Sequence, residues 1–386
     1  MEELFAVSEP GLEEFTAQEL QGLGLLPFAR LLSTRPQRGA ADERGGVEFV
    51  GDLRSIYRAN LSLRTASRVL VRLGDFHAAA FSELRKKASR LAWERYLVPG
   101  QAVALRVTCH KSRLYHANAV AERVAGAIGD RLHQLPPLHK FDGKPDADLP
   151  QLIVVRLVRD QCTISVDSSG ALLHRRGYRL ATAKAPLRET LAAGVIMAAG
   201  WDLDSPLLDP FCGSGTIPIE AALMARGIAP GRHRRFAFMD WPGFDPALWE
   251  AVLADCDQKS LSRIPEIMAS DRDAGAIQMA QANAERASVA DCIEFSPRAV
   301  SSIEPRGTGW VVTNPPYGLR VSAKKDLRNL YAQFGKVLWV LCPGWHVAIL
   351  CSDLRLLGNI GMSLDSSLSV VNGGVPVKLA RGIVET

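Results

Sequence analysis

The chain has 386 residues, more than one ordinary domain holds, so we expect two or three domains. Hydrophobic residues make up 47% of it and charged residues 23%, which indicates a globular protein with buried cores. No apolar run reaches the roughly 20 residues that a membrane span needs, and the acidic start at 1–4 lacks a signal-peptide layout. We therefore expect a cytoplasmic protein without a membrane segment.

The net charge of +5 is unevenly distributed. Residues 1–185 hold 27 Lys and Arg against 20 Asp and Glu, a net of +7, while the remainder holds 19 against 21, a net of −2. This asymmetry is typical of a polyanion-binding module attached to a second module, although an arginine-rich solvated surface has the same signature. Seven cysteines without a C-x-x-C pair, and eight histidines without ligand spacing, predict reduced thiols and no metal site.

The N-terminal half mixes short strands with amphipathic helices, which predicts an α+β module. Residues 1–51 predict a small strand–helix–strand segment, residues 52–166 a second unit, and residues 167–185 an arginine-containing connector. The expected elements of the second unit are strands at 66–73, 102–108, 152–157 and 162–166, helices at 81–96 and 117–132, and a surface loop at 136–150.

Residues 186–386 alternate strands and helices in the pattern of a doubly wound α/β domain with a mostly parallel sheet. The expected strands are at 206–208, 264–269, 293–295, 310–313 and 346–351, and the expected helices at 217–226, 274–286 and 327–341. Asn372-Gly373-Gly374 between two short apolar runs predicts an antiparallel hairpin at the end of this sheet. The strand that ends before Asp271 follows the glycine turn at a longer spacing than in a compact dinucleotide-binding unit, so we expect the insert 227–263 to loop out of that unit.

A glycine turn follows the first of these strands, in the string Asp209-Pro210-Phe211-Cys212-Gly213-Ser214-Gly215-Thr216. Glycines suit a sharp strand-to-helix turn where a side chain would block a ligand, and the next helix offers free N–H groups to a carboxylate. Asp209 can pair with an ammonium group, and Phe211 can form one wall. Cys212 is interpreted as a small packing residue rather than a nucleophile. Asp271 closes the second strand, where ribose hydroxyls would lie, although a helix N-cap has the same signature.

A second string, Asn314-Pro315-Pro316-Tyr317, follows the fourth strand. An ordinary Pro-Pro turn is one interpretation. The other is chemical, because the Asn314 side-chain carbonyl and the Pro315 backbone carbonyl can accept both hydrogens of a planar amine while Tyr317 stacks on its ring. Such acceptors pull the nitrogen toward tetrahedral geometry and free its lone pair. In this order, the two strings predict a site that holds S-adenosylmethionine and presents an amine to its methyl group.

These strings resemble motifs I and IV of the THUMP-domain class I S-adenosylmethionine-dependent RNA guanine-N2 methyltransferases, most of all the bacterial enzymes that act on 23S rRNA. The N-terminal half resembles the ferredoxin-like and THUMP modules of that family. The resemblance implies a ferredoxin-like segment at 1–51, a THUMP RNA-binding domain at 52–166 and a Rossmann-like methyltransferase domain at 186–386. It implies catalytic residues Asn314, Pro315, Pro316 and Tyr317, and cofactor contacts at Asp209, Pro210, Phe211, Cys212, Gly213, Ser214, Gly215, Thr216, Asp271 and Arg272.

Structured RNA is the partner that the resemblance implies. Basic residues that are candidates for phosphate contacts, and that are each also explained as solvated charges, are Lys111, Arg113, Arg175, Arg176, Arg179, Arg232 and Arg235. Three alternatives stay open: the same reaction on tRNA, methylation of adenine N6 in DNA or of a protein glutamine, and a non-catalytic RNA-binding relative. The last is motivated by Ser296-Pro297-Arg298, which ends the third strand without an acid, and by Gly318-Leu319-Arg320, where the family has Gly-Glu-Arg.

Overall fold

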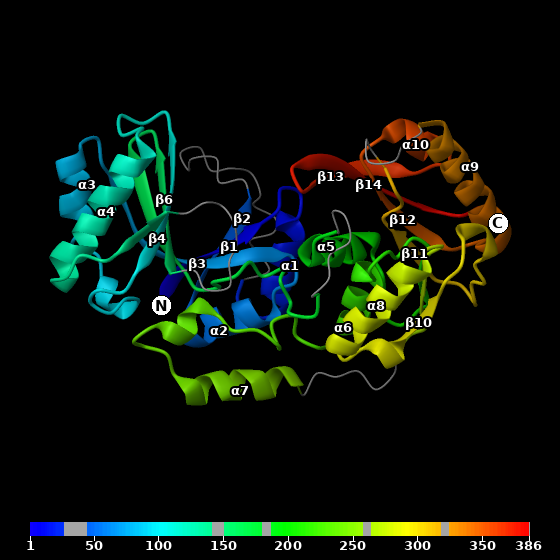
Figure 1. Cartoon of the computed structure of the whole chain (residues 1–386), viewed down its shortest axis with the longest axis horizontal. Helices are drawn as coiled ribbons and strands as arrows, with labels where there is room; N and C mark the ends of the chain where they lie inside the picture. Colours follow the sequence, from blue (N-terminus) through cyan, green and yellow to red (C-terminus); the bar gives the residue numbers. More distant parts are fainter. Residues whose placement is uncertain (27–44, 141–149, 180–186, 258–263, 318–323, 386) are drawn as a thin grey trace. The chain divides into compact units, whose positions relative to one another are not determined.

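The computed structural model describes residues 1–26, 45–140, 150–179, 187–257, 264–317 and 324–385 (Figure 1). They form two units, each of which includes a segment from the other half of the sequence. Unit 1 comprises Met1–Ser8, Thr16–Leu173 and Arg234–Leu253, and unit 2 comprises Glu9–Phe15, His174–His233 and Ala254–Thr386. Most of the predicted loop at 136–150, the end of the predicted connector and the Gly318-Leu319-Arg320 string lie outside the described residues.

One seven-stranded sheet runs through unit 1 in the order β2-β1-β3-β7-β6-β4-β5. The 12-residue strand β3 joins its two parts, because β3 pairs antiparallel with β1 near its start and with β7 toward its end. The strands are β1 (Glu2–Ser8), β2 (Gly46–Gly51), β3 (Ala66–His77), β4 (Val103–His110), β5 (Leu138–Lys140), β6 (Gln151–Val158) and β7 (Gln161–Asp167). Arg159 and Asp160, both with positive φ, form the turn of the antiparallel hairpin between β6 and β7.

The helices of unit 1 begin and end for local reasons. In the N-terminal half they are α1 (Glu13–Gly22), which starts in unit 2, α2 (Leu53–Ser62), α3 (Phe81–Ala88) and α4 (Ala117–Leu132), and Figure 1 shows α3 beside α4. The Asp52 carboxylate caps α2 by accepting the Ser55 N–H at 2.9 Å. The predicted helix at 81–96 is too long. It ends at Ala88 because Trp93 is fully buried and donates its indole N–H to the Ala88 carbonyl at 2.8 Å.

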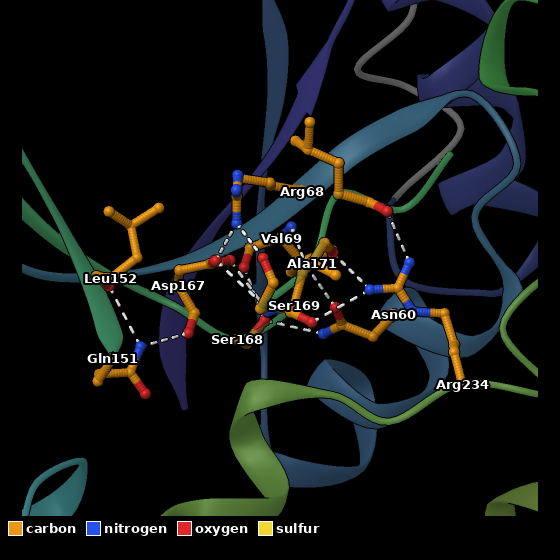
Figure 2. Close-up of polar contacts among 12 residues, drawn as sticks. Asn60, Arg68, Val69, Gln151, Leu152, Asp167, Ser168, Ser169, Ala171 and Arg234 are labelled. Atoms are coloured by element: carbon orange, nitrogen blue, oxygen red, sulfur yellow. Dashed lines mark hydrogen bonds and ion pairs between the residues drawn. The ribbon is translucent and has the colours of Figure 1, made fainter. Parts of the chain in front are cut away.

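A buried polar network lies where β7 ends (Figure 2). Asp167 accepts the Arg68 guanidinium, and its Oδ1 also accepts the Ser169 N–H at 3.0 Å. The Asn60 amide donates to Ser168 Oγ at 2.8 Å and accepts from Ser169 Oγ at 2.6 Å. Burial raises the pKa of Asp167, and the Arg68 charge opposes that shift. The network therefore joins the end of β7 to α2 and β3.

The segment Arg234–Leu253 attaches to this network, so this part of 227–263 does loop out of the unit that holds the glycine turn. The Arg234 guanidinium donates to the Leu172 carbonyl at 2.8 Å and to the Ala171 carbonyl (Figure 2). The Tyr57 and Phe238 rings stack with centroids 4.5 Å apart. The full aromatic cluster consists of Tyr57, Phe236, Phe238, Phe244 and Trp249, the last from α7 (Pro246–Asp257). Burial of these rings holds the segment in unit 1.

A second seven-stranded sheet forms unit 2 in the order β10-β9-β8-β11-β12-β14-β13. The strands from β10 to β12 pair in parallel, whereas β14 pairs antiparallel with β12 and β13, which confirms the predicted doubly wound sheet with its terminal hairpin. The strands are β8 (Leu207–Asp209), β9 (Ile267–Ser270), β10 (Ile293–Ser296), β11 (Trp310–Thr313), β12 (His346–Cys351), β13 (Asp365–Asn372) and β14 (Val375–Ile383).

Helices cover both faces of this sheet (Figure 1). Successive strand residues enter different cores: Val312 packs in the core that contains residues of α5, α6 and α8, and Val311 in the core that contains residues of α9 and α10. These helices are α5 (Glu189–Ala199), α6 (Thr216–Ala225), α8 (Ala274–Arg286), α9 (Lys324–Leu341) and α10 (Leu354–Gly358). Every helix among the described residues is too short or too polar to span a bilayer.

Candidate active site

The carboxyl ends of β8 and β11 lie side by side in the middle of the unit 2 sheet. β8 ends at Asp209 and β11 at Thr313, and the strands pair in parallel with Leu208 opposite Val311. The Thr313 hydroxyl donates to Asp209 Oδ1 at 2.6 Å and so links the two strand ends. The strand order reverses between β8 and β11, and doubly wound sheets bind their ligands at such a reversal. Both predicted strings therefore start from neighbouring points on one edge of the sheet.

The glycine turn after β8 has two glycines with different roles. Gly213 has a φ of +51°, and a Cβ atom there would have nothing within 4 Å, so the turn presents open space at this point. Gly215 has a φ of +84°, and a Cβ there would lie 2.9 Å from Ala280 Cβ in α8. Gly215 therefore permits helix packing rather than ligand approach. The buried Asn283 amide holds the turn by donating to the Ser214 carbonyl at 3.0 Å.

Asp209 is a buried carboxylate with few local partners. It is 1% exposed, and its Oδ1 accepts from Thr313 and from the Phe211 N–H at 3.1 Å. Burial raises the pKa of Asp209 to about 7; the Thr313 and Phe211 hydrogen bonds oppose this shift, and the Asp271 charge adds to it. A buried carboxylate at a strand end with a raised pKa marks a functional-site candidate, because a cationic ligand would relieve its desolvation.

Asp271 follows β9 and is partly exposed. Its Oδ2 accepts the Gly213 N–H at 3.1 Å and its Oδ1 accepts the Asp273 N–H at 2.9 Å. The helix N-cap of α8 is Asp273, which accepts from the Gly275 and Ala276 N–H groups. Asp271 is therefore not the cap, and it connects the β9 end to the glycine turn. Arg272 beside it is exposed.

The remaining side chains of the glycine turn pack inward. Phe211 is half-buried and meets Phe334 edge-on at a centroid distance of 5.3 Å. Cys212 is buried, and burial raises the pKa of its thiol well above the usual value, so the thiol stays protonated. Pro210 is buried, and the Thr216 hydroxyl accepts from Arg179 at 2.6 Å. These contacts support the packing role expected for Cys212.

The Asn314–Tyr317 string contains a buried acceptor that no described residue satisfies. Asn314 Oδ1 is inaccessible to solvent and accepts no hydrogen bond from the part of the chain that the structure describes. Pro315 is buried and Pro316 is exposed. The half-buried Tyr317 packs against both cores, and its hydroxyl accepts from the Asn372 amide at 3.0 Å. A buried carbonyl oxygen without a donor is costly, and an incoming amine would satisfy it.

The sequence match to family models agrees with this geometry. Residues 176–380 match the RMKL-like methyltransferase domain, residues 3–70 the RlmL ferredoxin-like domain and residues 78–167 the THUMP domain. The chain belongs to the RMKL-like methyltransferase family. The methyltransferase match alone covers more than half of the chain, and the two N-terminal matches lie in unit 1 except for residues 9–15.

Two curated relatives and one solved structure resemble this RMKL-like chain over almost its whole length. It is 36% identical to the ribosomal RNA large subunit methyltransferase K/L of Methylococcus capsulatus over 98% of this chain, and it spans about half (50%) of that relative's length. It is 34% identical to a Synechocystis protein named provisionally as an RNA methyltransferase, covering 98% of this chain and 95% of the relative. The crystal structure of SMU.472 complexed with SAH has a TM-score of 0.85 and 29% identity, covering 100% of this chain and 98% of that one.

The candidate phosphate-binding residues fall into two groups. Five of them are exposed: Lys111, Arg113, Arg175, Arg232 and Arg235. Arg235 also pairs with Asp240. Arg176 and Arg179 are instead directed into unit 2, where Arg176 Nε lies 3.5 Å from Glu220 Oε1 and Arg179 Nε lies 3.3 Å from Glu189 Oε1, with all four side chains at most 9% exposed. These buried pairings argue against a phosphate role for Arg176 and Arg179, and we withdraw that expectation.

Sequence reasoning missed three residues that support the site. Thr313 stands directly before the recognised string and could have been found as a hydroxyl at a strand end. Asn372 belongs to the recognised hairpin signal, but nothing in that signal indicates a bond to Tyr317. Asn283 lies in the middle of α8, and only the packing of α8 on the turn reveals its role.

Proposed function

We propose that this chain is an S-adenosylmethionine-dependent methyltransferase that acts on the exocyclic N2 amine of a guanine in structured RNA, with 23S rRNA as the favoured substrate. The strongest support for this proposal is the Asn314 side-chain carbonyl oxygen, which is buried and accepts no hydrogen bond from the described residues. Asn314 directly follows Thr313, whose hydroxyl links the end of β11 to Asp209 at the end of β8. It puts an acceptor for an amine directly after the strand that neighbours the glycine turn.

The residues present fit the cofactor. Asp209 is a buried carboxylate that an ammonium group would neutralise, and Gly213 leaves open space where a side chain would otherwise stand. The partly exposed Asp271 would accept from ribose hydroxyls beside the turn. The SAH complex of SMU.472 supports the same assignment. When bound, S-adenosylmethionine supplies the methyl group, and the amine nitrogen that receives it gives up one proton.

Asn314 to Tyr317 would hold the substrate. The Asn314 side-chain carbonyl and the Pro315 backbone carbonyl would accept the two amine hydrogens, and the proline ring keeps these acceptors preorganised. Tyr317, whose hydroxyl is held by Asn372, would stack on the base. This chemistry depends on positioning and electrostatics and needs no strongly basic side chain.

RNA is favoured over DNA or protein by the THUMP match at 78–167 and by the excess positive charge of the first 185 residues. The favoured substrate follows from the ribosomal RNA methyltransferase relative, half of whose length this chain spans.

The test is methyl transfer from isotopically labelled S-adenosylmethionine to purified 23S rRNA, with total tRNA as the matched substrate, followed by nucleoside analysis. We expect N2-methylguanosine in the 23S rRNA. Label confined to tRNA would refute the ribosomal assignment, and label on adenine would refute the guanine assignment.

A further inference from the structure

The loop between β4 and α4 of unit 1 presents an aromatic side chain to solvent. Tyr115 is 68% exposed, and its ring packs beside the His116 ring at a centroid distance of 4.1 Å and an interplanar angle of 40°. The residue before them, Leu114, is 4% exposed and anchors the loop in the core. The chain therefore buries the neighbouring leucine while leaving a large aromatic ring uncovered.

Hydrogen bonds to the β6–β7 turn hold this loop in place. The Asp160 carboxylate accepts the Arg113 N–H at 2.7 Å, and the Asp160 N–H donates to Ser112 Oγ at 3.1 Å. The Arg159 N–H and the Ser112 hydroxyl both donate to the His110 carbonyl at 3.1 Å. These hydrogen bonds hold the loop in one conformation, so the exposed Tyr115 ring has a defined position.

The surroundings of Tyr115 are positively charged. From His110 to Asn118 the sequence contains Lys111 and Arg113 and no acidic residue. The Arg113 side chain is 78% exposed, and its Nε lies 3.9 Å from Asp160 Oδ2, a separation that leaves the guanidinium reachable from solvent. The Asp160 carboxylate of the adjoining turn also accepts the Arg113 backbone N–H. Arg159, at the adjoining turn, is exposed as well.

We propose that Tyr115 and His116 form a stacking platform for an unpaired nucleotide of the RNA substrate, with Lys111 and Arg113 contacting the flanking phosphates. Single-stranded RNA is bound by exposed aromatic rings that stack on bases and by cations that follow the backbone, and this loop presents both on a fixed scaffold. A base paired within a duplex has no free face to stack on Tyr115. The proposal rests on the proposed function in taking RNA as the ligand, and it adds that an unpaired stretch is what unit 1 recognises.

The experiment compares binding of a short single-stranded oligoribonucleotide and a blunt RNA duplex to the full chain and its variants. Tyr115→Ala should weaken single-strand binding about tenfold or more and leave duplex binding unchanged, because stacking on one base is lost. Tyr115→Phe should retain single-strand binding. Leu135→Ala, at an apolar position in unit 1 that is 67% exposed, is the matched control and should change neither. Lys111→Ala with Arg113→Ala should weaken both ligands and reduce the salt dependence by about one ion per residue removed.

A second readout reports stacking directly. An oligoribonucleotide carrying the fluorescent adenine analogue 2-aminopurine should be quenched by the wild-type chain and by Tyr115→Phe, but much less by Tyr115→Ala at saturation. Equal loss of single-strand and duplex binding in Tyr115→Ala, or no loss of either, would overturn the platform. These outcomes are independent of catalysis, so a chain that methylates no RNA would refute the proposed function while the binding comparison still decides the platform.

Discussion

Removing the Thr313 hydroxyl should make cofactor binding strongly dependent on pH. Thr313→Val keeps the shape of the side chain but removes the 2.6 Å hydrogen bond to Asp209, in a place where Thr313 is 0% and Asp209 1% exposed. That bond lowers the pKa of Asp209, which burial raises to about 7. Without the donor the carboxylate has one stabilising contact fewer, so its pKa should rise further.

The size of the effect follows from the energy of a hydrogen bond to a charged group. Such a bond contributes about 1.5–3 kcal/mol. This corresponds to roughly one to two pKa units. At pH 7 the ionised share of Asp209 should then fall from about half in the wild type to about a tenth or less in the variant. If only the ionised form binds the ammonium group, apparent affinity at pH 7 should fall about 5- to 50-fold.

Calorimetric titration with S-adenosylhomocysteine between pH 6 and 8 measures how the binding affinity of each protein depends on pH. The wild-type affinity should rise with pH and level off above pH 7, whereas the affinity of Thr313→Val should keep rising to pH 8. Thr190→Val is the matched control, because Thr190 is a fully buried threonine of unit 2 whose hydroxyl has no hydrogen-bond partner among the described residues. Equal affinities for wild type and Thr313→Val at pH 7, or affinities independent of pH in both, would refute the role given to Asp209.

Three further predictions concern stability and turnover. In the folded chain the pKa of Asp209 is raised from 3.8 to about 7, so the folded chain binds a proton that the unfolded chain loses within this range. The free energy of unfolding should therefore fall as the pH rises from 3.8 to about 7. Asp209→Asn, which carries no charge there, should have a higher melting temperature than the wild type at pH 8 but not at pH 4. Asn314→Ala should lower kcat at least 100-fold with little change in the Kd for S-adenosylhomocysteine, an estimate of the order found for removed oxyanion-hole donors; an unchanged kcat would exclude the assigned role. Phe238→Ala should destabilise unit 1 by about 3–5 kcal/mol, seen as a lower melting temperature that Leu135→Ala does not reproduce.

The fold of unit 2 was predictable because its signals are local. Each central strand is a short apolar run, and each ends at a recognisable turn, as at Asp209 and Asn314. The strand order that brings those two turns together is a property of doubly wound sheets, so the edge that holds the site could also be predicted. The structure adds the Thr313–Asp209 bond and the unsatisfied Asn314 oxygen, which depend on side-chain orientation.

The misjudged features depend on contacts between residues far apart in sequence. Arg176 and Arg179 resemble surface cations in the sequence, but Glu220 and Glu189 pair with them in the interior of unit 2. The helix at 81–96 has good periodicity throughout, yet burial of Trp93 ends it at Ala88. The segment that contains Arg234 joins unit 1 through carbonyl groups that follow β7, and no local pattern indicates that partner.

We propose that Asn314 holds a guanine amine of ribosomal RNA for methylation. Nucleoside analysis of 23S rRNA from cells that lack this chain, and from the same cells supplied with wild-type or Asn314→Ala protein, tests it most directly. We predict that one N2-methylguanosine disappears from the 23S rRNA without the chain, returns with the wild type and stays absent with Asn314→Ala. An unchanged modification profile in the deletion, or full restoration by Asn314→Ala, would refute this role of Asn314.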